Sequence, residues 1–120
     1  MSEAKSNVAT STHKNQVVLA GTVVRDPDRR ATKTGKTVTS FTVRTVWGKA
    51  SEFHRVVAWE ELAEKAALLK PEMFVEVTGR LQTRSWDDPK GGGKKYSTEI
   101  VAREISGRQN PEIGDADLPF

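Results

Sequence analysis

Apolar and β-branched residues gather in five short runs along the chain, and polar stretches containing glycine or proline separate them. The length and composition of each run are typical of a β-strand. The runs cover residues 16–25, 37–46, 52–59, 73–83 and 96–105. Gly21 lies inside the first run, and a glycine within a strand indicates a bulge or a sharp bend. The fourth run alternates most clearly, which predicts a core-facing row of Met73, Val75, Val77, Gly79 and Leu81.

Residues 60–70 follow a helical period instead, because Leu62, Ala66 and Leu69 recur at helical spacing. Pro71 is expected to end this helix. Residues 26–36 and 87–95 are polar and contain proline and glycine, so both are interpreted as loops. The predicted order is three strands, one helix and two more strands. This order favours an all-β, five-stranded OB-fold, a Greek-key barrel whose groove commonly takes oligonucleotides.

The two ends of the chain show neither period. Residues 1–15 are predicted to be a disordered arm and residues 108–120 a flexible acidic tail, which leaves one folded domain over residues 16–107. No apolar run is long enough for a membrane span. The first 15 residues also lack the apolar stretch of a signal peptide, so a cytoplasmic location is expected.

Charge separates the body of the chain from its end. The net charge is +3, but residues 16–108 hold 17 Lys/Arg against 12 Asp/Glu, whereas residues 109–120 hold three acids and no base. A basic body favours contact with a polyanion, and a well-solvated surface with surplus charge is the equal alternative. Cysteine is absent, which excludes disulfides, thiolate metal sites and a cysteine nucleophile.

Aromatic and basic side chains occur together near the strand ends. Two-residue alternation places on one face of the third run the side chains of Phe53, Arg55, Val57 and Trp59. It places on one face of the fourth run and its extension the side chains of Arg80, Gln82, Arg84 and Trp86. Sequence-tolerant binding of a single strand needs aromatic rings that stack on bases and cations that follow the phosphates. Burial of the aromatics in an ordinary core is the alternative.

Several of these runs resemble one family, the bacterial single-stranded DNA-binding proteins. The similar segments are Glu52-Phe53-His54-Arg55-Val56-Val57, residues 77–86 and the opening strand with Arg25-Asp26-Pro27. The resemblance covers about residues 16–105. It returns in the last six residues, Asp-Ala-Asp-Leu-Pro-Phe, which are similar to the family's acidic terminal peptide.

The resemblance implies sequence-independent binding and protection of single-stranded DNA at the nucleoid, with no enzymatic activity, no cofactor and no metal. It implies base stacking by Trp47, Phe53, Trp59 and Trp86. Phosphate contacts are expected from Arg25, Arg44, Arg55, Arg80, Arg84, Lys90, Lys94 and Lys95. The family usually forms homotetramers, and the resemblance puts His54 near a subunit interface. Position 53 is Phe where the family often has Trp, and position 59 is Trp where it often has Phe; both exchanges keep an aromatic ring.

The acidic end is expected to recruit DNA replication, repair and recombination enzymes. An aromatic ring beside the terminal carboxylate suits an apolar pocket with a basic rim, and a merely solubilising end is the alternative. The docking residues are Asp115, Asp117, Leu118, Pro119 and Phe120. The linker before them and the segment between Trp47 and Phe53 are both shorter than is usual in the family. We therefore expect a short reach for the tail and fewer DNA contacts in that segment.

The same chain contains residues that resemble parts of other functional sites. Gly35-Lys36-Thr37 imitates the end of a phosphate-binding loop, but Arg30 stands where that motif requires its first glycine. Asp26, Asp28, Glu52 and His54 have no recognised metal-ligand spacing. Three alternatives stay open at this point: a primosome-type OB adaptor that acts through protein contacts, a metal-dependent nuclease and an RNA chaperone.

Overall fold

Six strands and one helix make up the part of the chain that the computed structural model describes, residues 12–108. The strands are β1 (Val17–Val23), β2 (Asp28–Ala31), β3 (Thr37–Trp47), β4 (Ala50–Trp59), β5 (Phe74–Asp87) and β6 (Lys94–Arg108). The helix, α1 (Glu61–Ala66), lies between β4 and β5. The predicted all-β architecture with a single helix is confirmed. Most of the predicted arm (1–11) and nearly all of the predicted tail (109–120) lie outside the described residues.

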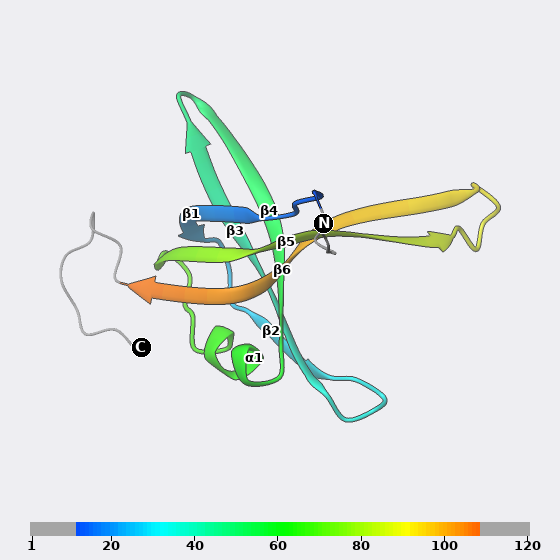
Figure 1. Cartoon of the computed structure of the whole chain (residues 1–120), viewed down its shortest axis with the longest axis horizontal. Coiled ribbons are helices and arrows are strands. Elements are labelled where there is room, and N and C mark those ends of the chain that lie inside the picture. The colour runs from blue at the N-terminus through cyan, green and yellow to red at the C-terminus, as the bar shows by residue number, and fades with distance from the viewer. Residues whose placement is uncertain (1–11, 109–120) are drawn as a thin grey trace, which may run out of the picture.

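The strands form one sheet in the order β1-β5-β6-β4-β3-β2, and β1 also pairs with β3, which closes the sheet into a barrel. All pairs are antiparallel except β4 with β6, which run parallel at Val56↔Ile100 and Val57↔Val101. Figure 1 shows that the β3–β4 hairpin and the β5–β6 hairpin both extend beyond the barrel, in different directions. The faces of the barrel therefore continue onto two projecting arms.

Alternating side chains from every long strand fill the barrel. The strands contribute Val23, Phe41, Val43, Val56, Ala58, Val75, Val77, Ile100 and Ile105 to the core. Ala66 of α1, together with Leu69 and Met73 after it, belongs to the same core. Buried Thr39 of β3 donates a hydrogen bond of 2.8 Å from Oγ1 to the carbonyl oxygen of Ala63. This bond joins α1 to β3 and adds a directional contact to the packing of the buried Ala63 and Ala66.

The helix is shorter than the predicted range of 60–70. It ends at Ala66, five residues before Pro71, so the proline does not set its end. The next residues turn more tightly, because the amides of Leu68 and Leu69 donate to carbonyls three residues back, those of Lys65 and Ala66. The tighter turn brings Leu69, which is 2% exposed, into the core.

The region 26–36 is also more ordered than the loop that the sequence predicts. Residues 28–31 form β2, which pairs with residues 37–40 of β3 although all four of its side chains are exposed. Propensity gave no signal for this strand because three of its four residues are charged. The turn between β2 and β3 holds the two strands together. The amide of Thr32 donates to the carbonyl oxygen of Lys36, and the amide of Lys36 donates to Oγ1 of Thr32, around Gly35, whose φ is 87°.

Gly21 does not lie at a bulge as the sequence predicts, and its role in the fold is different. The register of β1 with β5 runs without a break from Val17 to Thr22, and the bulge of the sheet lies instead at Thr78/Gly79. A Cβ atom at position 21 would stand 2.2 Å from the backbone carbonyl oxygen of Arg44 on β3. The glycine therefore permits β1 to approach β3 where the barrel closes.

Leu81 does not belong to the core row that the alternation predicts. It faces the same side as its partner Ile100, but β5 has left the barrel at this point and Leu81 is 47% exposed. The amide side chain of Asn15 bonds both backbone groups of Leu81, with its Nδ2 donating to the carbonyl and its Oδ1 accepting from the amide, each at 2.8 Å. The side chain of Asn15 thus continues the β1–β5 ladder by one step.

An exposed ion pair links β2 to α1. Arg29 donates from Nε to Oε1 of Glu64 at 3.0 Å and from Nη2 to Oε2 at 2.7 Å. These hydrogen bonds, with the charge of Arg29, hold the pKa of the Glu64 carboxyl below its ordinary value, and the same pair raises the pKa of Arg29. Arg29 points towards the helix while its neighbours in β2, Asp28 and Arg30, line the opposite side.

Arg29→Gln is expected to lower stability slightly at neutral pH, with a smaller deficit at acid pH. Because the folded pKa of Glu64 is lowered, its contribution is fully present above the unfolded value of about 4.3 and is lost progressively as the pH falls through the lower, folded value. Thermal unfolding of both proteins at pH 7 and near pH 3.5 measures this. Arg103→Gln, an exposed charge removal on β6, is the control, and an equal deficit for Arg29→Gln at both pH values would contradict the expectation.

Candidate nucleic-acid interface

A groove of about 360 Å³ crosses the outer face of the barrel between β2 and β5. Neighbouring strands in the order β5-β6-β4-β3-β2 each contribute side chains to it. The lining residues are Asp28, Arg30, Val38, Ser40, Arg55, Val57, Trp59, Gln82, Arg84 and Glu99. The alternation along β4 that fills the core with Val56 and Ala58 turns Arg55, Val57 and Trp59 outwards to this groove.

Two of the predicted phosphate-contacting arginines meet in the groove. Arg55 of β4 and Arg84 of β5 are about half exposed, and β6 lies between their strands. Each guanidinium contacts the carboxylate of Glu99 on β6, at 3.3 Å for Arg55 and 3.1 Å for Arg84. The sequence alone could not bring these residues together, because β4 reaches β6 only through the parallel pairing of distant segments.

Three of the four predicted stacking aromatics share the groove face or its extensions. Trp59, 41% exposed, lines the groove itself. Phe53 lies farther along β4, opposite Arg44 of β3, and Trp86 lies on the β5–β6 arm, opposite Lys95. Their exposed fractions of 61% and 45% exclude the alternative in which these rings are ordinary core residues.

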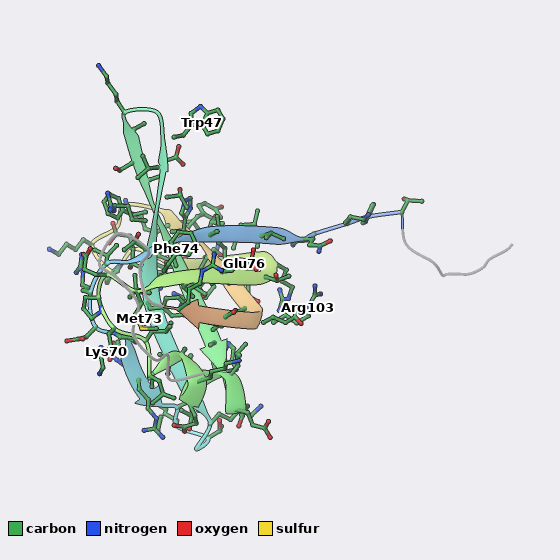
Figure 2. The ribbon with its side chains drawn as sticks, turned by 90° about the vertical axis from the view of Figure 1, so that its left-hand side faces the viewer. Trp47, Lys70, Met73, Phe74, Glu76 and Arg103 are labelled. Atoms are coloured by element: carbon green, nitrogen blue, oxygen red, sulfur yellow. The ribbon has the colours of Figure 1, made fainter. Side chains whose placement is uncertain are left out.

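Trp47 lies apart from the other three. It is the last residue of β3, 89% exposed, at the tip of the β3–β4 arm. Figure 2 shows its ring beside that tip, far from the barrel residues Phe74 and Glu76. Alternation places Trp47 with Val43 and Thr45, on the side of the hairpin that continues the core-facing row. Its ring therefore does not stand on the face of Phe53 and Trp59.

The lysines of the predicted basic finger have acidic neighbours. Lys94 lies 3.6 Å from Asp87 and Lys95 lies 3.9 Å from Asp88, between terminal nitrogen and carboxylate oxygen. Asp88 also accepts a hydrogen bond from the backbone amide of Lys90 at 2.9 Å, which shapes the tip. Both lysines are more than half exposed, although the side chain of Asp88 is 21% exposed. A polyanion can therefore compete for the lysines, but it must displace the carboxylates.

The remaining predicted residues lie around the groove or behind it. Arg25 shares a smaller hollow of about 210 Å³ with Arg55, next to the groove, and Arg80 lies exposed on β5 opposite Val101. His54 faces the other side of β4, where its Nε2 and the hydroxyl of Thr45 are 2.8 Å apart. The five predicted docking residues, 115, 117 and 118–120, lie outside the described residues.

Sequence reasoning missed the acidic residues of the groove. Glu99 is one of two buried polar or charged side chains within residues 12–108, and Asp28 pairs with Arg30 through an Oδ2–Nε contact of 2.8 Å. A signal for Glu99 was present. It is a lone acid inside an otherwise β-branched run, and alternation from Ile100 places it opposite the core side. A charge at that place needs a partner of opposite sign.

Residues 12–108 contain no group of three or more His, Cys, Asp or Glu side chains arranged to hold a metal ion. No helix in that part of the chain has the length and apolar character that crossing a membrane requires.

Comparison with known proteins agrees with this geometry. Residues 14–107 match the model of the single-strand binding protein family. The chain is 45% identical over 118 residues to single-stranded DNA-binding protein 1 of Chlorobaculum tepidum, covering 88% of this chain and 73% of that protein. It is 37% identical to the single-stranded DNA-binding protein of Caldanaerobacter subterraneus, covering 76% of this chain and 65% of that protein. It is 38% identical to single-stranded DNA-binding protein 2 of Listeria innocua, covering 76% of this chain and 62% of that protein.

The match extends over the whole barrel and both arms, and with it over every described residue of the groove. The relatives are longer than this chain, which spans between 62 and 73% of their length. The chain belongs to the single-strand binding protein family.

Proposed function

We propose that this protein binds single-stranded DNA without reading its sequence, and protects the strand during replication, recombination and repair. The observation that carries the proposal is the groove in which the ring of Trp59 lies with the guanidinium groups of Arg55 and Arg84. An aromatic ring stacks on any base, and guanidinium groups pair with phosphates whatever the sequence. The names of the relatives, all single-stranded DNA-binding proteins, support the same function.

The proposed path of the strand follows the outer face across β4, β6 and β5. Phe53 and Trp59 stack bases over β4, and Trp86 stacks one on the β5–β6 arm. Trp47, on the far side of the β3–β4 arm, takes a base only where the strand passes around that hairpin. The proposed phosphate contacts are Arg25, Arg44, Arg55, Arg80, Arg84, Lys90, Lys94 and Lys95. Binding of this kind needs no catalysis and no cofactor, and it puts the protein on the nucleoid in the cytoplasm.

A homotetramer is the proposed assembly, with His54 near a contact between subunits. A single OB groove covers only about 4–16 nucleotides, so joining four grooves raises avidity for a long strand. The place of His54 on the side of β4 away from the groove supports this, because a subunit contact there leaves the groove open. Sedimentation equilibrium tests the assembly, and a monomer at micromolar concentration contradicts it.

The acidic end is the proposed docking peptide for replication, repair and recombination enzymes, through Asp115, Asp117, Leu118, Pro119 and Phe120. A short extended peptide of this composition suits an apolar pocket with a basic rim. Affinity capture from a bacterial lysate with the full chain and with a chain lacking residues 115–120 tests it. Equal recovery of such enzymes by both chains contradicts the proposal.

Intrinsic tryptophan fluorescence tests the DNA-binding proposal directly. Titration with oligo-dT, oligo-rU and matched duplex DNA at two salt concentrations is expected to give strong quenching by oligo-dT alone. The affinity should fall as salt rises, with a slope near −0.7 per phosphate neutralised, as is usual for single strands. Stronger quenching by oligo-rU would favour an RNA chaperone. No quenching by any strand would leave the aromatics without a ligand and favour a protein adaptor.

A further inference from the structure

Glu99 is a buried carboxylate on the floor of the groove. Only 5% of its side chain is exposed, although it lies on the outer face of β6 and not in the barrel core. Its Oε2 is 3.3 Å from Nε of Arg55, and its Oε1 is 3.1 Å from Nε of Arg84. A buried charge is costly unless it is paired, so the two arginines explain how the carboxylate is tolerated. They do not explain what it does.

The arrangement leaves the arginines ready for a second anion. Both side chains remain about half exposed, and each contact with Glu99 uses Nε. A guanidinium held through Nε can still present its two terminal nitrogens to a phosphate, and Arg–phosphate pairs are strongest when two parallel N–H groups point at the oxygens. Two guanidinium groups this close also repel each other. The carboxylate between them offsets that repulsion and fixes both side chains over one groove.

The charge of the trio is as informative as its geometry. Arg55, Arg84 and Glu99 together carry one net positive charge, so the two arginines release fewer counterions on binding DNA than two unpaired arginines would. Glu99 lowers the electrostatic contribution of the two arginines to DNA binding. It therefore favours binding only if the orientation that it gives the arginines contributes more free energy than the positive charge that it neutralises. Glu99 is therefore expected to affect the affinity for DNA in two ways, through the orientation of the arginines and through its own charge. Affinity measurements can distinguish the two effects.

We propose that Glu99 is a positioning residue for DNA binding, which holds Arg55 and Arg84 in place for the phosphates of the bound strand. This inference rests on the proposed function, since it names how that same groove is organised. Glu99 itself touches no phosphate. It acts through the two arginines, and its own charge makes binding less dependent on salt than the number of arginines in the groove would indicate.

Oligo-dT affinity over a range of salt concentrations tests the proposal with two substitutions of Glu99. Glu99→Gln keeps the shape, but one of the two carboxylate oxygens, each of which contacts one Nε group, becomes an amide nitrogen that can only donate. At moderate salt its affinity is expected to fall about tenfold, the effect of losing about one charged hydrogen bond. Its salt dependence is expected to steepen by about 0.7, because one more positive charge faces the strand.

Glu99→Asp keeps the charge but shortens the side chain by one methylene, so it loses reach to at least one arginine. Its affinity is expected to fall while the slope against salt stays at the wild-type value. Glu104→Gln is the matched control, because it removes the same charge from the same strand at an exposed position outside the groove. The control is expected to leave affinity within about twofold of the wild type and the slope unchanged.

Three results would overturn the proposal. Glu99→Gln could behave like Glu104→Gln, or it could bind more tightly at every salt concentration, which would make the carboxylate a mere competitor of phosphate. In a chain that already carries Arg55→Gln and Arg84→Gln, Glu99→Gln could weaken binding further, which would mean that it acts through the fold and not through the arginines. Failure of the wild type to bind oligo-dT at all would instead refute the proposed function.

Discussion

Replacing Trp59 with alanine is expected to weaken the binding of oligo-dT about 5- to 150-fold, because a stacked base contributes about 1–3 kcal/mol. Trp59 is the stacking candidate that lines the groove together with both arginines, so no neighbouring ring can take over its base without moving the strand. Its side chain is 41% exposed, so the substitution removes little from the core and the protein should fold. Equilibrium titration by fluorescence anisotropy of a labelled oligonucleotide measures the loss.

Two variants make the Trp59 result interpretable. Trp59→Phe keeps an aromatic ring and should recover most of the affinity. Leu68→Ala removes an exposed apolar side chain beyond the end of α1, outside the groove, and should leave affinity unchanged. Wild-type affinity for Trp59→Ala would show that no base stacks on this ring, and the path of the strand would then have to run along the arms.

Gly21→Ala is expected to destabilise the protein by about 3 kcal/mol, the upper end of the usual cost of overpacking. The added Cβ would stand 2.2 Å from the carbonyl oxygen of Arg44, and it would also contact the side chain of Val43 at 3.0 Å. A backbone atom cannot rotate out of the way as a side chain can, so β1 must separate from β3 where the barrel closes. Thermal unfolding should report a midpoint lower by more than about 10 °C.

The neighbouring residue Ala20 provides the control for Gly21. Its side chain is exposed on the opposite face of β1, so Ala20→Val adds more volume than Gly21→Ala without meeting the β3 backbone. Its midpoint is expected to stay close to that of the wild type. An equal loss for both variants would indicate that β1 tolerates no change at all, and an unchanged midpoint for Gly21→Ala would mean that β1 and β3 are not in contact there.

The sequence alone predicted the parts of this structure that depend on local periodicity. Alternation separated Val56 and Ala58, which are buried, from Arg55 and Trp59, which face the groove. The same reasoning failed for Leu81, because two-residue counting says which side a residue faces but not where the strand leaves the barrel. It also missed β2, whose charged residues form a strand through pairing with β3 and not through their own propensity.

The sequence predicted individual residues of the site but not how they come together in the groove. The face of β4 and the face of β5 could each be derived from alternation, but their meeting across β6 depends on a parallel pairing between distant segments. The partnership of Arg55 and Arg84 through Glu99 was therefore out of reach of the sequence. Trp47 shows the opposite limit, since it was grouped with the other aromatics by type and by resemblance, and counting along β3 places it on the other side.

The parallel contact between β4 and β6 also decides when the groove can exist as the chain folds. The β3–β4 and β5–β6 hairpins join neighbouring segments and can form early, whereas Val56↔Ile100 and Val57↔Val101 require closure of the long loop that contains α1 and β5. Arg55 reaches Glu99 only after that closure. A nascent or partly folded chain thus displays both aromatic arms before Arg55 joins Arg84 over Glu99, and the groove with its paired arginines is a property of the completed barrel.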